Sequence, residues 1–178
     1  MKIDDIDRSE KTMTDTNKTV QPLLEAGQII PSFSLPDADG MTYSPWNYKQ
    51  RQHLLLLFTR SSSSSETRGL LRAFAQQYPA FRGEDCSILA ITPDPVIGNL
   101  RVQEELHLPF PLLGNPGGEV IARYTRWDSA TRTLYPSIIL ADRYNALYQQ
   151  WIAEQEAHLP PIEELLAALR YLNSLCTP

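Results

Sequence analysis

Cysteine is scarce in this sequence. The chain has 178 residues and two cysteines, Cys86 and Cys176, and neither belongs to a Cys-x-x-Cys pair. Closely spaced cysteines mark zinc sites, and many cysteines in a short chain indicate a disulfide framework. The sequence therefore predicts neither a metal centre nor a disulfide scaffold, and a redox role has to use two thiols that lie far apart in the chain.

Long apolar runs and clusters of positive charge are also missing. No apolar run is much longer than Leu54–Phe58, whereas a membrane-spanning helix needs about 20 residues. The N-terminal stretch "MKIDDIDRSEKTMTDTNK" has no apolar core of the kind a signal peptide carries. The net charge is -5, without the clustered Lys and Arg that nucleic acids require. We therefore expect a cytoplasmic protein with no membrane partner and no nucleic-acid partner.

The composition suits one folded domain with an arm. Hydrophobic residues make up 42% of the chain, enough for a single core at this length. Residues 1–24 are rich in Asp, Lys, Thr and Asn and lack periodicity, so we expect a disordered or extended N-terminal arm. The domain is expected over residues 25–178. Nothing in it indicates a bound cofactor.

Strand and helix patterns alternate along the domain. Alternation between residues 33 and 43, with a turn at Asp39-Gly40, predicts a hairpin. The continuous run "HLLLLF" (53–58) predicts a central strand, "SILAIT" (87–92) a second buried strand, and "YPSIILADRYNALYQQWIAEQ" (135–155) two strands joined around Asp142 to Asn145. Helices are predicted from Ser64 to about Ala80, from Pro95 with Asp94 as N-cap, and along the apolar stripe of residues 162–172. The fold class is α/β, a mixed central sheet flanked by helices.

Five serines join the central strand to its helix. In one interpretation they only cap the helix, with Ser63 as N-cap and Glu66 completing a capping box. In the other, their hydroxyls, the free helix N–H groups and Arg60 form an anion-binding pocket. The serines in question are Ser61, Ser62, Ser63, Ser64 and Ser65.

Three motifs carry a resemblance to a known family. They are the opening "GQIIPSFSLPDADG", the strand "LLLLFTR" and the segment "YPSIILAD". Together they resemble the thioredoxin-like superfamily, and within it the peroxiredoxin or alkyl hydroperoxide reductase/thiol-specific antioxidant (AhpC/TSA) group. The resemblance implies a thioredoxin-like fold and, for family members, peroxide reduction. It also implies that Pro136, in the third motif, follows a cis peptide bond.

The resemblance places the family's two thiols in the serine loop. Anchored on Phe58 and Arg60, the first thiol position is Ser64 and the second is Thr67, so both thiols are replaced by hydroxyls. Members also carry an Arg just before the third motif's strand. Leu134 and Tyr135 precede Pro136 here, and Arg132 is the nearest guanidinium.

These residues and the resemblance lead to two hypotheses for the function. In the first, the protein is a family member without thiol peroxidase activity and acts as a binding or scaffold module through Arg60, Ser61 to Ser65 and Pro136. The alternative is an antioxidant or thiol oxidoreductase using Cys86 or Cys176, although Cys86 at a strand entrance also suits an inert structural thiol. The partner is a small molecule or a protein, and a homodimer through Cys176 stays open.

Two other residue groups have simpler interpretations. Serine hydrolysis needs a base near the hydroxyl, but His53 begins the central strand at the end opposite the serines, and no Gly-x-Ser-x-Gly elbow occurs. The basic aromatic stretch around residues 123–132 is expected to be a solvated helix face. Its members are Arg123, Tyr124, Arg126, Trp127 and Arg132.

Overall fold

A five-stranded mixed sheet forms the centre of the computed structural model, which describes residues 20–175. The strand order is β5 (Leu112–Gly114), β4 (Cys86–Thr92), β3 (His53–Phe58), β8 (Ser137–Ala141) and β9 (Leu147–Ile152). β3 pairs parallel with β4 and antiparallel with β8. The run "HLLLLF" is thus the middle strand, which confirms the prediction, and every residue of it is buried.

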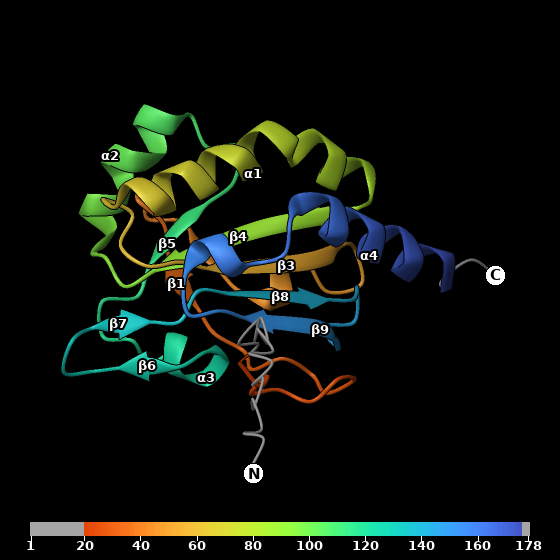
Figure 1. The fold of residues 1–178 in the computed structure, drawn as a ribbon. Helices are drawn as coiled ribbons and strands as arrows, with labels where there is room; N and C mark the ends of the chain where they lie inside the picture. The colour runs from red at the N-terminus through yellow and green to blue at the C-terminus, as the bar shows by residue number, and fades with distance from the viewer. Residues whose placement is uncertain (1–19, 176–178) are drawn as a thin grey trace, which may run out of the picture.

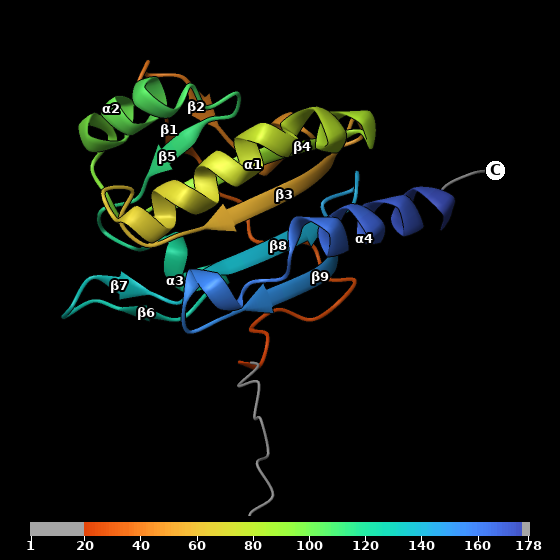
Figure 2. The same ribbon diagram turned by 45° about the horizontal axis from the view of Figure 1, so that its top comes forward.

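Helices cover one face of the sheet, and shorter elements cover the other (Figures 1 and 2). On the first face lie α1 (Ser65–Gly83), α2 (Val96–Leu106) and α4 (Ile162–Leu175). On the second lie α3 (Ile121–Tyr124) and the short strands. Each face of the sheet therefore has its own hydrophobic core, and strand β3 contributes side chains to both. Leu55 and Leu57 pack toward α1 and α4, while Leu54 and Leu56 face the opposite side. The α/β class is therefore confirmed.

Two hairpins and two single turns of 3-10 helix complete the fold. β1 (Leu35–Pro36) and β2 (Thr42–Tyr43) form the predicted hairpin. Its turn holds Gly40 at φ 79°, a left-handed conformation that favours glycine. A second hairpin, β6 (Trp127–Asp128) with β7 (Thr133–Leu134), was not predicted. The 3-10 turns are η1 (Pro45–Asn47) and η2 (Glu156–His158).

The stretch around residues 123–132 is not a solvated helix face. Helix α3 ends at Tyr124, whose ring is fully buried and stacks on Phe58 with centroids 5.0 Å apart. Trp127 is half-buried, and Arg132 lies in the turn of the β6–β7 hairpin. The prediction was wrong because the helix is one turn long, so its aromatic residue closes the second core instead of facing water.

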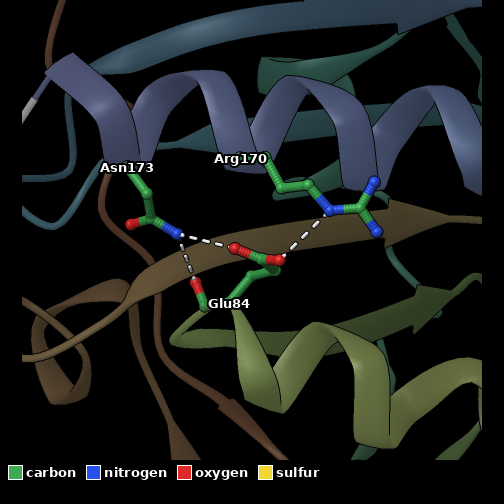
Figure 3. A network of polar contacts seen from close by, with 3 residues as sticks. All are labelled: Glu84, Arg170 and Asn173. Carbon is green, nitrogen blue, oxygen red and sulfur yellow. Dashed lines mark hydrogen bonds and ion pairs between the residues drawn. The ribbon is translucent and has the colours of Figure 1, made fainter.

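Polar contacts dock the C-terminal helix α4 against the end of α1 (Figure 3). Glu84, which follows α1, accepts from Arg170 Nε at 3.3 Å and from Asn173 Nδ2 at 3.1 Å. The Glu84–Arg170 pair is solvated and contributes at most about 1 kcal/mol. Asn173 also bonds Nε2 of the buried His53 at 2.9 Å, so this cluster ties α4 to the first residue of β3.

The predicted N-terminal arm lies mostly outside the described residues. Residues 1–19 are not described, and neither is Cys176. At the start of the described chain, the backbone N–H groups of Leu23 and Leu24 both donate to Gln150 Oε1 on β9. The chain is therefore attached to the sheet before residue 25.

The bond before Pro136 is trans, so the predicted cis bond was wrong. The Tyr135 N–H donates to the Arg126 carbonyl, and the Tyr135 carbonyl accepts from Thr125 Oγ1 at 2.7 Å. These contacts hold an extended path from β7 into β8. A trans bond suits that path, and trans is already favoured by about 0.5–1 kcal/mol before proline.

Candidate functional site

The serine loop leaves the end of β3 and enters α1 at Ser64. Ser64 is the N-cap, since its backbone is extended and its Oγ accepts from the Thr67 N–H at 3.1 Å. The capping interpretation is correct in kind, but Ser63 was the wrong residue. With Ser64 as N-cap, Glu66 is the second residue of the helix, whereas a capping box needs the glutamate at the third. A backbone N–H of this first turn, together with Ser65, lowers the pKa of the exposed Glu66.

An internal carboxylate occupies the donors that the loop offers. Asp94 accepts from Ser61 Oγ at 3.0 Å through Oδ1 and from the Ser62 N–H through Oδ2. Asp94 does not cap α2, whose N-cap is Pro95 with no side-chain bond. The predicted cap was wrong because the Asp94 side chain instead accepts hydrogen bonds from the serine loop that follows β3. Part of the proposed anion pocket is therefore filled by the protein's own anion.

A second carboxylate lies beneath the first turn of α1. Glu156, 8% exposed, accepts from the Arg60 backbone N–H at 3.1 Å and from Thr67 Oγ1 at 3.0 Å. Thr67 is fully buried, whereas Ser64 is half-buried. The two positions that the family resemblance assigns to thiols thus differ sharply, because Thr67 contacts a carboxylate and Ser64 faces a cavity.

That cavity has a volume of about 460 Å³ and is formed by three segments. The serine loop contributes Arg60, Ser61 and Ser64, the β4–α2 turn contributes Asp94, and the β6–β7 hairpin contributes Arg132. Ser62 and Ser63 line an adjoining cavity on the α2 side, which shares Ser61 and Asp94 with the first, and Ser65 is exposed. Pro136 is buried and is not among the residues that line either cavity. The structure therefore brings together only part of the predicted binding surface.

Cys86 lies far from this cavity. It begins β4 and pairs in register with His53, the first residue of β3, whereas the serines follow the last residue of β3. The thiol is fully buried, and burial raises its pKa. Because a reactive cysteine needs access and a stabilised thiolate, Cys86 has the character of a structural thiol.

Sequence reasoning missed the roles of Asp94 and Glu156. Asp94 had a signal, because it follows β4 just as the serines follow β3, and the carboxyl ends of neighbouring parallel strands meet at one edge. Glu156 had none, since it lies 89 positions from Thr67. Within residues 20–175 no group of three or more His, Cys, Asp or Glu side chains is arranged to hold a metal ion. No helix in that span is long and apolar enough to cross a bilayer.

Fold and site together define a thioredoxin-like α/β domain whose helix-capping loop carries hydroxyls. The chain belongs to the AhpC/TSA family, whose model matches residues 26–150. Similar curated proteins include Peroxiredoxin bcp1 of Schizosaccharomyces pombe, 22% identical over 107 residues, and the chloroplastic Peroxiredoxin Q of Populus jackii, 24% identical over 107 residues. Each match covers 60% of this chain, and it spans 55% and 50% of those relatives.

Solved structures share the fold. Peroxidoxin BcpB of Mycobacterium tuberculosis superposes with a TM-score of 0.75 at 20% identity, over 84% of this chain and 98% of that one. Peroxiredoxin Q of Xanthomonas campestris superposes with a TM-score of 0.71 at 18% identity, over 84% of this chain and 97% of that one. The thioredoxin-like fold is therefore confirmed, and the trans bond before Pro136 does not contradict it.

Proposed function

We propose that this AhpC/TSA family member has no thiol peroxidase activity and works as a binding module through the cavity at Arg60, Ser61 and Ser64. The observation that supports the proposal is the chemistry at the head of α1, where Ser64 and Thr67 place hydroxyls at the positions that the family resemblance assigns to thiols. A serine or threonine hydroxyl has no counterpart to the oxidation of a thiolate to a sulfenic acid. The site keeps the geometry of a ligand pocket without the redox group.

The alternative, an antioxidant or thiol oxidoreductase, needs Cys86 or Cys176. Burial of Cys86 argues against it, because peroxide has no access to that sulfur and the thiolate is disfavoured. Cys176 lies outside the described residues, so it keeps the alternative open.

A peroxide-consumption assay with a dithiol reductant separates the two functions. We expect the wild type to consume hydrogen peroxide and an alkyl hydroperoxide no faster than the reductant alone. The control is a Cys86→Ala/Cys176→Ser variant, with alanine at position 86 because a buried serine hydroxyl would need a partner. Turnover in the wild type that disappears in this variant would overturn the proposal, and the two single substitutions would then assign the thiol.

Location and assembly belong to the same proposal. A cytoplasmic location is part of this proposal, and cell fractionation tests it. The partner is proposed to be a small molecule rather than nucleic acid or membrane, since the cavity is small and the net charge is -5. A homodimer stays a proposal that the mass of the native protein in solution tests directly.

A further inference from the structure

The cavity at the serine loop has an uneven distribution of charge. Two arginines, Arg60 and Arg132, are among the residues that line it, together with one acidic residue, Asp94. Apolar surface between the charges comes from Pro93, Pro95 and Leu134. A cavity of about 460 Å³ with mainly apolar walls and a few polar groups is typical of small-molecule sites.

The two arginines have donors to spare. The Arg60 side chain donates through Nη2 to the Glu154 carbonyl, and its Nε is buried without a partner. Arg132 donates through Nη2 to the Pro116 carbonyl at 2.8 Å. Within residues 20–175 neither guanidinium forms an ion pair with a carboxylate. Because each guanidinium has five N–H donors in a fork that fits a carboxylate, this side of the cavity favours an anionic group.

Asp94 sets the opposite requirement. Its two oxygens each accept one hydrogen bond from the serine loop, and a carboxylate offers about four lone-pair sites in all. A purely anionic ligand would be repelled by this carboxylate, and a purely cationic one by the two arginines. A ligand that carries both charges satisfies both sides.

We propose that the cavity binds a small amino carboxylate with an apolar body, with its carboxylate at Arg60 and Arg132 and its ammonium at Asp94. The apolar body packs against Pro93, Pro95 and Leu134. The inference rests on the proposed binding function and gives it a ligand class. It also explains why the chain keeps a carboxylate, that of Asp94, beside a serine loop otherwise suited to anions.

Calorimetric titration of the full chain with three matched probes tests the proposal. The probes are L-leucine, with both charges, 4-methylpentanoate, which lacks the ammonium, and isoamylamine, which lacks the carboxylate. We expect leucine to bind at least about tenfold more tightly than either single-charge probe, since each lost charged hydrogen bond costs about that factor. Equal binding of leucine and 4-methylpentanoate would overturn the role of Asp94, and absence of leucine binding would overturn the proposal.

Two substitutions locate the site. Arg132→Gln should weaken leucine binding about tenfold, and Asp94→Asn should remove the preference for leucine over 4-methylpentanoate. Arg123→Gln is the matched control, because Arg123 is also exposed and also donates to a backbone carbonyl, that of Ser32, but lies outside the cavity. Leucine binding that both Arg132→Gln and Asp94→Asn leave unchanged would place the ligand elsewhere and overturn the assignment.

The outcome is separable from that of the proposed function. The peroxide assay on the same preparation reports the redox chemistry alone. A protein that is inactive toward peroxide and does not bind leucine would overturn the ligand class while leaving the redox-inactive interpretation standing. Thermal unfolding of each variant, with a midpoint close to that of the wild type, shows that a loss of binding does not come from a loss of fold.

Discussion

Cysteine placed at each of the two positions that the family resemblance assigns to thiols, Ser64 and Thr67, should behave in opposite ways. In Ser64→Cys the sulfur replaces an oxygen that caps a 19-residue helix and accepts from the Thr67 N–H. The helix dipole and a charged hydrogen bond together favour the thiolate by about 2 kcal/mol. At about 1.36 kcal/mol per pKa unit, the thiol should titrate near 7 to 7.5 instead of about 8.5, with Asp94 opposing part of the shift.

Thr67→Cys puts the sulfur in a buried position beside a carboxylate, which disfavours the thiolate. The Thr67 side chain is fully buried, and its Oγ1 lies 3.0 Å from Glu156 Oε1. A thiolate about 4 Å from a carboxylate is disfavoured by about 4 kcal/mol at an effective dielectric constant of 20. Burial adds to this cost, so the thiol pKa should exceed about 10.

The assay is the rate of alkylation by iodoacetamide as a function of pH, in a Cys176→Ser background. Cys86 stays, because its burial keeps it unreactive in the native state, and the background protein alone verifies this. Adding Glu156→Gln to Thr67→Cys should bring that thiol's pKa down, whereas it should leave Ser64→Cys nearly unchanged. An ordinary pKa for Ser64→Cys, or a lower pKa for Thr67→Cys than for Ser64→Cys, would refute the argument from the cap and the buried carboxylate.

Three further predictions concern stability. Leu56→Ala, in the fully buried middle of β3, should lower the free energy of unfolding by about 2–5 kcal/mol in urea titrations, and a loss under 1 kcal/mol would contradict the central-strand assignment. Burial lowers the pKa of His53 in the folded protein. The stability that the neutral, buried His53 contributes is therefore complete above about pH 6.5, the pKa of histidine in the unfolded chain, and is lost as the pH falls below that value. The slope is at most about 1.4 kcal/mol per pH unit, and urea titrations from pH 7.5 to 5 should show a smaller loss in His53→Gln than in the wild type. Gly118→Ala should lower the midpoint of thermal unfolding more than Gly27→Ala does. Both glycines have a positive φ, but only at Gly118 would an added Cβ lie 2.1 Å from the Trp127 ring. Equal midpoints for the two variants would refute this reasoning.

The sequence by itself determined the framework. A continuous apolar run such as Leu54–Phe58 is typical of a strand covered on both faces, so its central place followed from the order of the residues. The Asp39-Gly40 turn and the apolar stripe of the last helix are local signals in the same sense, because the residues that form each element are neighbours in the chain. The absence of cysteine from the serine loop was likewise visible in the letters, since residues 59–69 contain none.

The tertiary structure alone decided what surrounds those hydroxyls. Ser63 and Ser64 are equally good caps by residue type, and the choice between them depends on where the chain leaves β3. Asp94 was an acceptable cap for its own helix until the parallel pairing of β3 and β4 placed it beside the serine loop. Glu156 reaches Thr67 across 89 positions, a contact that exists only because η2 packs beneath α1. Local patterns specify local geometry, whereas the charges that tune a site come from segments that only folding brings together.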